Sequence, residues 1–300
     1  MRTTDWLLLL LLSLLWGASF FFAAVAVREI PPLTLVLARV ALAALMLAPI
    51  ARALGLSLPT GLAAWRAYAT LAVLNNVIPF SLIVYGQTRI ASGLASVLNA
   101  TTPLFTLLVA RAFAGEPLTL ARLAGVLLGI AGVALLMGPD ALSASAGSTL
   151  GMLCVLAAAF SYGLSACWMR RFKAVPPLVS AEAQLVASTV LLLPLAVLVD
   201  RSWSLPLPSG TAIAAVLGLA AFSTALAYIV FFRISATAGP SNVMLVTLLI
   251  PVTAAGLGAM VLGERLAANQ VVGGLVIASG LAVIDGRLVG WLARRRASAA

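Results

Sequence analysis

Histidine is absent from the 300-residue sequence, cysteine occurs only twice, and charged residues make up 9% of the chain. A conventional transition-metal site therefore lacks its usual nitrogen and sulfur ligands. The two cysteines, Cys154 and Cys167, fall in one expected helix. They are about 20 Å apart at 1.5 Å per residue, so they cannot form an intrahelical disulfide. We expect no metal ion and no cofactor.

The shortage of charge comes with an excess of apolar residues, which form 63% of the sequence. This composition leaves too little polar surface to face water, so a soluble fold is excluded. The 18 basic residues give a net charge of +10. Because they are scattered between apolar runs and form no basic face with interleaved aromatic residues, we do not expect nucleic-acid binding.

Apolar stretches of about 20 residues, the length that crosses a bilayer as a helix, run through the whole chain between Pro, Gly and charged residues. The sequence therefore predicts an all-α integral membrane protein with ten transmembrane helices. The predicted spans are residues 6–27, 33–52, 67–87, 92–113, 121–138, 149–171, 179–199, 211–233, 240–262 and 270–292.

The distribution of basic residues predicts the orientation of these spans. With the N-terminus in the cytoplasm, the inside segments hold thirteen Lys and Arg residues and the outside segments hold four, while Arg39 falls within a helix. The positive-inside rule then places both termini on the cytoplasmic side of a bacterial-type inner membrane. Residues 294–300 form a basic cytoplasmic tail in this arrangement.

The sequence also repeats itself at a spacing of 148 residues. This shift aligns Pro103 with Pro251, Gly115 with Gly263, Glu116 with Glu264, Leu118 with Leu266, Gly125 with Gly273 and Gly132 with Gly280. Each unit holds five helices, an odd number, so the second unit enters the membrane in the opposite direction, as in many secondary transporters. We predict two inverted five-helix repeats, residues 1–140 and 147–293.

Shifts of 145 and 146 align further motifs, Pro31-Pro32-Leu33 with Pro176-Pro177-Leu178 and Trp16-Gly17-x-Ser19 with Tyr162-Gly163-x-Ser165. The sequence resembles the EamA-domain branch of the drug/metabolite transporter superfamily over both halves. The residues that carry this resemblance are Trp16-Gly17-x-Ser19, Arg39, Pro103 to Gly115-Glu116-Pro117-Leu118, and Pro251 to Gly263-Glu264-Arg265-Leu266. A glycine-rich helix follows each of the last two.

This resemblance implies ten helices around a central cavity and export of small metabolites by alternating access. Within the family, the chain looks most like exporters of amino acids, aromatic and other neutral ones included. One departure concerns Arg39, whose counterpart at a shift of 145 is Gln184. The intramembrane charge therefore occurs in only one copy, and a role for Arg39 need not be mirrored.

Other functions stay open from the sequence. The substrate of a carrier is an amino acid, or a drug, a nucleoside or a cationic compound. A membrane-embedded enzyme on a lipid-linked substrate needs a reactive cluster, yet the eight acids are dispersed. A channel needs a ring of charges or a filter motif, and no GxxxxGK[ST] loop for ATP is present. We expect a non-enzymatic secondary transporter whose partners are a small-molecule substrate and the lipid bilayer.

Three prolines near the middle of predicted spans point to helix breaks, because each removes the hydrogen bond to the carbonyl four residues earlier. They are Pro79, Pro103 and Pro251, and the freed carbonyls belong to Asn75, Asn99 and Thr247. A broken helix inside a bilayer is tolerated only against protein or a water-lined cavity. Single Asn and Thr residues also tie helices together, but the pair of Asn75 and Asn76 favours a cavity lining.

Other candidates for substrate contact come from their depth within the spans: Trp16, Ser19, Ser161, Tyr162, Ser165, Ser223 and Thr224. Aromatic walls with a few hydroxyl and amide groups suit an amphiphilic molecule such as a zwitterionic amino acid. Tyr228 is a further candidate. Both it and Trp168 lie nearer the cytoplasmic side, where aromatic residues also form the interfacial belt.

Charged residues inside spans are candidates for gating or coupling. Arg39 lies about 9 Å into the second helix from its outer end. There it holds a carboxylate, gates the outer mouth, or extends its side chain to the interface. Glu182, near the cytoplasmic end of the seventh helix, is the best-placed acid for proton coupling, although a carboxylate so close to the surface also stays hydrated.

Two repeated features are expected to be structural. Glu116 and Glu264 precede the fifth and tenth helices, whose first turns they are expected to cap. Gly125 and Gly129 form a GxxxG motif, and glycines also line the matching tenth helix. We expect these glycines to allow close helix packing. Homodimerisation through them is possible, although a monomer is sufficient.

Overall fold

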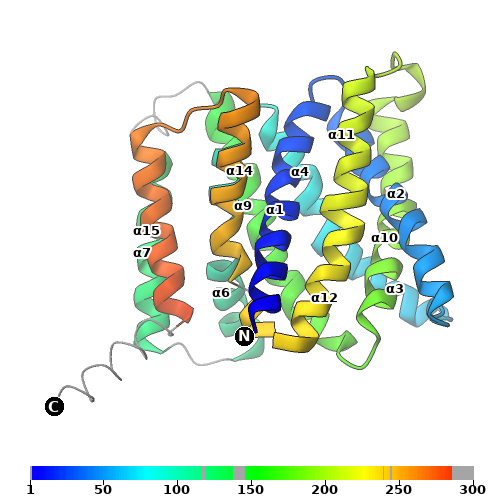
Figure 1. Ribbon diagram of the computed structural model, residues 1–300, viewed down its shortest axis with the longest axis horizontal. Coiled ribbons are helices and arrows are strands. Elements are labelled where there is room, and N and C mark those ends of the chain that lie inside the picture. The colour runs from blue at the N-terminus through cyan, green and yellow to red at the C-terminus, as the bar shows by residue number, and fades with distance from the viewer. Residues whose placement is uncertain (1, 116–118, 138–145, 239, 244, 286–300) are drawn as a thin grey trace.

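The computed structural model describes residues 2–115, 119–137, 146–238, 240–243 and 245–285 (Figure 1). In the first half the elements are α1 Thr3–Ala26, α2 Pro32–Ala53, α3 Leu62–Ala72, the π-helix η1 Val73–Val77, α4 Ile78–Gln87, α5 Ser92–Asn99, α6 Thr102–Ala114 and α7 Leu120–Met137.

The second half follows the same order. Its elements are α9 Ala146–Met169, η2 Arg170–Phe172, α10 Pro177–Leu195, η3 Ala196–Asp200, η4 Ser202–Ser204, α11 Gly210–Ala220, the π-helix η5 Ala221–Leu226, α12 Ala227–Ala238, α13 Pro240–Val243, α14 Val246–Leu262 and α15 Ala268–Asp285.

These elements combine into ten apolar spans, which confirms the predicted all-helical membrane fold. Seven of the helical segments are long and apolar enough to cross a bilayer, and the three shorter ones are Leu120–Leu136, Val246–Leu262 and Ala268–Ile284. The ends predicted at 138 and 292 fall outside the described residues, as do the basic tail 294–300 and Glu116. The repeat borders, 1–140 and 147–293, stay predictions.

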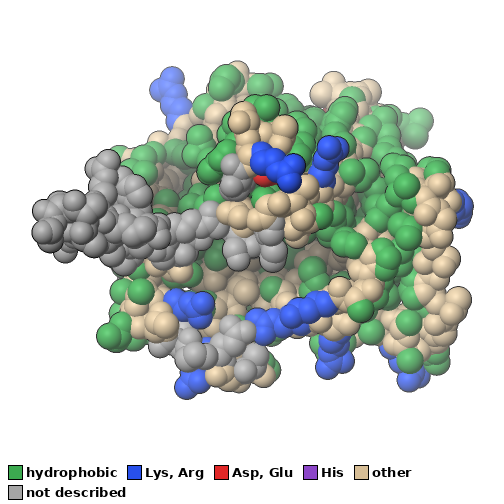
Figure 2. Space-filling view, turned by 60° about the horizontal axis from the view of Figure 1, so that its bottom comes forward, with side chains coloured by type: hydrophobic (Ala, Val, Ile, Leu, Met, Phe, Trp, Pro, Cys, Tyr) green, Lys and Arg blue, Asp and Glu red, His purple; other side chains and the backbone are tan. Residues whose placement is uncertain are grey.

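The spans run up and down between two ends of the molecule, so α1 begins at the same end at which α15 finishes (Figure 1). Figure 2 shows this end turned forward, with Lys and Arg side chains spread over it. At the opposite end lie the turns that join α1 to α2 and α14 to α15 (Figure 1).

Glycines bring α7 and α15 together at one edge of the molecule (Figure 1). A Cβ built on Gly125 would lie 2.6 Å from the carbonyl oxygen of Gly280, and one on Gly132 would lie 2.8 Å from that of Gly273. The 148-residue shift turns Gly125 into Gly273 and Gly132 into Gly280, so each of these contacts is the repeat equivalent of the other. The two helices are therefore equivalent in the repeat and pack in opposite directions. The glycine faces expected to allow close packing are therefore used within one chain.

The same inverted relation appears between α1 and α14 on one side and α9 and α6 on the other. A Cβ on Gly17 would overlap the Thr253 side chain, and one on its repeat mate Gly163 would lie 3.0 Å from the backbone of Phe105. Thr253 and Phe105 are themselves related by the 148-residue shift. The aligned Gly17 and Gly163 thus position the helices that carry Pro251 and Pro103.

The three prolines have three different effects on their helices. Pro79 lies in the first turn of α4, directly after the π-helix η1. Pro103 lies in the first turn of α6, after the irregular residues Ala100 and Thr101, and the freed carbonyl of Asn99 accepts a 2.7 Å hydrogen bond from the Thr102 hydroxyl. The helical pattern therefore changes just before both of these prolines.

The interruption expected at Pro251 is wrong, because α14 continues through this residue from Val246 to Leu262. The ninth span instead changes between α13 and α14, several residues earlier. A proline removes only one backbone hydrogen bond, and a helix packed on its neighbours can bend without ending. The Thr253 hydroxyl, which donates to the Ser13 carbonyl oxygen at 2.8 Å, fixes α14 to α1 in this region.

Carboxylates fasten the ends of the spans opposite the N-terminus. The Glu264 carboxylate accepts from the Ser92 amide at 2.9 Å and from the Ser92 hydroxyl at 2.7 Å. It therefore caps α5 of the first repeat, not the following helix α15 as predicted. The reason is the left-handed turn at Gly263, which directs the chain back across Gly258.

Glu29 makes the corresponding contact to α11. Its carboxylate accepts from the amide and the hydroxyl of Ser209, both at 2.7 Å, and Ser209 caps the first turn of α11. These two hydrogen bonds hold the pKa of Glu29 below its ordinary value. At the same end, Asp200 accepts from the amide and hydroxyl of Thr34 in α2.

We expect Gly132→Ala to destabilise the protein, because the new Cβ would meet the fixed backbone oxygen of Gly273. Overpacking of this kind costs about 1–3 kcal/mol. Gly256→Ala is the matched control, since the nearest atom to its new Cβ is the flexible Met260 Cε at 3.7 Å. Thermal unfolding of both variants in detergent measures the difference, and equal melting temperatures would contradict the proposed close contact.

We also expect the Glu29 contact to weaken in acid. Because the folded-state pKa lies below that of the unfolded chain, the stabilisation is present above the unfolded pKa and is lost as pH falls through the folded pKa. Melting temperatures measured between about pH 6 and pH 3.5 should fall less steeply for Glu29→Gln than for the wild type. Ser209→Ala should flatten the curve only in part, because the backbone amide of residue 209 still donates to Glu29. Unchanged slopes in Glu29→Gln would exclude this linkage.

Candidate functional site

The π-helices η1 and η5 each place two consecutive polar residues in the middle of a span. In η1 these are Asn75 and Asn76, and in η5 they are Ser223 and Thr224. A π-turn inserts one residue into an α-helix and shifts the side chains that follow it, and such turns occur often at functional sites. Asn76, Ser223 and Thr224 are buried.

Arg39 of α2 lies against η5. Its Nε donates a 3.0 Å hydrogen bond to the Thr224 hydroxyl, and its guanidinium carbon stands 3.7 Å above the centre of the Phe80 ring. The side chain is only 9% exposed, so it does not extend to the interface. The titratable residues near it within the described part of the chain are Tyr162 and Tyr228, not a carboxylate.

Asn75 forms the centre of a second polar group, against α10 and α9. Its amide nitrogen donates to Gln184 Oε1 at 2.8 Å, and its carbonyl oxygen accepts from the Ser165 hydroxyl at 2.9 Å. The neighbouring Asn76 donates to Ser188 at 2.9 Å. These side chains come from three different spans, which they hold in register.

Tyr228 lies near both groups, close to Arg39 and Asn75, and packs against the same apolar core as Phe80. Tyr162, the repeat mate of Trp16, packs against this core too and also lies near Arg39. Arg39, Asn75, Gln184, Tyr162 and Tyr228 thus belong to one polar and aromatic cluster inside the bundle, which we call the central cluster together with Asn76, Ser165, Ser188, Phe80, Ser223 and Thr224.

Other predicted residues take separate partners. The Trp16 ring lies 5.5 Å from that of Phe231, and the Ser19 hydroxyl donates to the carbonyl oxygen of Trp16 in its own helix. Ser161 donates to the Leu74 carbonyl oxygen at 2.8 Å.

Three candidates lie on helices outside the central cluster. Asn99 is at the end of α5, with a buried side-chain oxygen, Oδ1, that has no hydrogen-bond partner among the described residues. Thr247 is half-buried in α14. Trp168 donates to the Ala67 carbonyl oxygen and packs under the Arg171 guanidinium at 3.9 Å.

Glu182 is buried in the first turns of α10, five residues after the helix begins at Pro177. Arg52 of α2 is a basic residue in its neighbourhood. The structure therefore places this acid next to a basic residue and two positions before Gln184 in the same helix.

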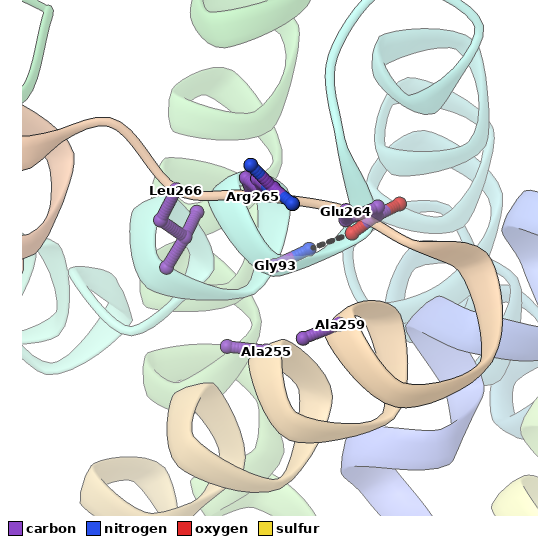
Figure 3. Close-up of a pocket in the computed structure, with 6 residues that line it drawn as sticks. All are labelled: Gly93, Ala255, Ala259, Glu264, Arg265 and Leu266. Atoms are coloured by element: carbon purple, nitrogen blue, oxygen red, sulfur yellow. Dashed lines mark hydrogen bonds between the residues drawn. The ribbon is translucent and has the colours of Figure 1, made fainter.

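Two hollows lie away from the central cluster. One of about 440 Å³ lies between α5, α14 and the turn after α14 and is lined by Gly93, Ala255, Ala259, Glu264, Arg265 and Leu266 (Figure 3). The Glu264 carboxylate inside it is already bonded to the start of α5 (Figure 3). The other, an apolar groove of about 110 Å³, lies between α6, α7 and α9.

Comparison with known families matches residues 5–138 and 149–285 to the EamA-like transporter family. The chain belongs to this family. The two matched segments correspond to the two halves of the fold and together cover nearly all of the described residues, so the family assignment confirms the resemblance seen in the sequence.

Relatives in the family are named as transporters. The uncharacterized transporter YoaV of Bacillus subtilis (strain 168) is 24% identical over 90% of this chain and 92% of its own length. The uncharacterized inner membrane transporter YedA of Escherichia coli (strain K12) is 27% identical over 85% and 82%. A probable amino-acid metabolite efflux pump of Escherichia coli (strain K12) is 28% identical over 94% of both chains.

A solved crystal structure shares the fold, with a TM-score of 0.67 and 21% sequence identity over 95% of this chain and 98% of that chain. At this identity the likeness concerns the fold alone. Family membership and fold together establish that this chain is a membrane transporter of the EamA type.

Sequence reasoning missed Gln184, Ser188 and Phe80 as members of the central cluster. The sequence identifies Gln184 only as the uncharged counterpart of Arg39 in the second repeat. The available signal was the repeat itself: a shift of 148 relates Asn75 to Ser223, Asn76 to Thr224 and Phe80 to Tyr228. A position that the repeat pairs with a predicted site residue, as Phe80 is paired with Tyr228, is therefore itself a candidate for the site.

Proposed function

We propose that this transporter exports small carboxylate-bearing metabolites, above all neutral and aromatic amino acids, across the inner membrane by alternating access. The observation that carries the proposal is Arg39, a buried cation within the bundle with no carboxylate partner among the described residues. Such a charge inside a membrane span is costly and marks a substrate or ion pathway.

An anionic substrate group offsets this cost. A carboxylate that meets Arg39 forms charge-assisted hydrogen bonds, which are roughly twice as strong as neutral ones. The surrounding Phe80, Tyr162 and Tyr228 rings offer an apolar surface with two hydroxyl groups. A zwitterion with an apolar or aromatic side chain fits this combination, whereas a cationic compound meets a repulsive charge.

The proposed orientation places both termini in the cytoplasm, as the distribution of basic residues predicts. The Lys and Arg side chains spread over the end that carries the N-terminus support this orientation (Figure 2). Export is favoured by the likeness to a protein named as a probable efflux pump. Glu182 is the proposed site of proton coupling, and Trp16, Ser19, Asn99 and Thr247 are proposed to line the route on either side of the central cluster.

Uptake of radiolabelled Phe, Trp, Thr and Met by liposomes that contain the purified protein tests this function. We expect saturable uptake by the wild type and at least a tenfold loss in Asn75→Ala, which leaves Gln184 and Ser165 without their shared partner; loss of one charge-assisted or buried hydrogen bond costs about 1–3 kcal/mol. Ser279→Ala, an exposed hydroxyl on α15, is the control and should keep wild-type uptake. Runs with and without a pH gradient measure proton coupling.

Absence of uptake of every amino acid above that of empty liposomes would overturn the amino-acid assignment and direct the search to nucleosides and drugs. Conversion of the added compound to a product would instead support the membrane-enzyme alternative. Equal uptake by Asn75→Ala and the wild type would show that transport does not depend on the Asn75 contacts in the central cluster.

A further inference from the structure

The central cluster consists of two half-sites related by the internal repeat. A shift of 145 relates Arg39 to Gln184, and one of 148 relates Ser223 and Thr224 to Asn75 and Asn76. In each half a residue seven positions into a helix that starts with proline faces a π-helix of the other repeat. The contacts are Arg39 to Thr224 at 3.0 Å and Asn75 to Gln184 at 2.8 Å.

The chemistry of the two half-sites is unequal. The Gln184 half is neutral and its amide groups are bonded to one another and to Ser165 and Ser188. The Arg39 half carries a positive charge. Beside Thr224, the residue Ser223 is 1% exposed, and its buried hydroxyl has no hydrogen-bond partner among the described residues. A buried polar atom of this kind costs free energy until a partner arrives.

The half-sites also lie at different depths. Helix α2 begins at the end of the molecule opposite to that at which α10 begins (Figure 1). Seven residues correspond to about 10 Å along a helix, so Arg39 lies in the half nearer the turn between α1 and α2, and Gln184 lies in the half nearer the N-terminus. Tyr228 lies near both Arg39 and Asn75.

We propose, building on the proposed function, that the two half-sites receive the two charged ends of one α-amino acid. Arg39, Ser223 and Thr224 bind the carboxylate with N–H and O–H donors. The carbonyl oxygens of Asn75 and Gln184, each of which keeps a lone pair after the bonds described above, accept from the ammonium group. The carboxylate then points towards the outer end of the path, and the recognised class is the zwitterion, not the organic anion or the amine.

Three probes of similar size separate these classes: phenylalanine, phenylalaninamide, which lacks the carboxylate, and 3-phenylpropionate, which lacks the ammonium group. Competition with radiolabelled phenylalanine uptake in liposomes gives a ratio of apparent affinities for each variant. We expect the wild type to prefer phenylalanine by at least about tenfold over either analogue, since each analogue loses the charge-assisted hydrogen bonds of one end.

Arg39→Gln should abolish the preference for phenylalanine over phenylalaninamide, and Arg39→Lys should keep part of it because the charge remains. Gln184→Leu should reduce the preference over 3-phenylpropionate while leaving that over phenylalaninamide. The exchange variant, Arg39→Gln with Gln184→Arg, should recover a carboxylate preference, since positions 39 and 184 are equivalent in the repeat. Thermal unfolding in detergent identifies folded variants, and binding of the three probes is measured by tryptophan fluorescence where transport is lost.

An unchanged preference in Arg39→Gln would overturn the inference, as would an exchange variant that behaves like Arg39→Gln alone. A wild type that transports all three probes equally would also overturn it while leaving the proposed transport function intact. Failure to transport or bind phenylalanine at all would instead refute the proposed function itself.

Discussion

In a bilayer, backbone amides and carbonyls have no water to bond with, so every span must satisfy them internally. The polar side chains of the central cluster gather where the α-helical hydrogen-bond pattern changes. At these places the backbone amides and carbonyls need other hydrogen-bond partners. At η1 and η5 the backbone shifts to π-turns, and Thr224 donates back to the Leu219 carbonyl oxygen at 2.9 Å while it accepts from Arg39. The π-helix η5, an irregular turn that is costly in a membrane, thus also positions the charged side chain of Arg39.

Around these irregular turns the inverted repeat supplies rigidity. Glycine contacts such as Gly132 to Gly273 bring repeat mates to backbone distance, and carboxylates such as Glu264 fasten one repeat to the start of a helix in the other. These contacts join residues far apart in sequence, so the two halves depend on each other for packing. An alternating-access transition must preserve the glycine contacts or exchange them for equivalent ones.

The ten spans could be predicted because hydrophobic length and punctuation by Pro, Gly and charge are local signals. The effect of a proline is less local. Pro79 and Pro103 follow changes in the helix, but Pro251 lies in a continuous one, because its neighbours in α1 support α14 there. Likewise Glu264 precedes α15 in sequence yet caps α5, since the turn at Gly263 decides which amides its carboxylate reaches.

The central cluster was predictable in part for a related reason. The position of a residue along its span selects Asn75 and Thr224, but it selects Ser19 and Trp16 equally well. The reason is that position along a span does not tell which face of the helix carries the residue. The repeat carries that missing information: it pairs Arg39 with Gln184, and each of these residues contacts a π-helix of the other repeat, Arg39 at Thr224 and Gln184 at Asn75. The two repeats therefore keep residues at equivalent positions in the fold while the side chains at those positions differ. As a result, the two half-sites of the central cluster differ in charge.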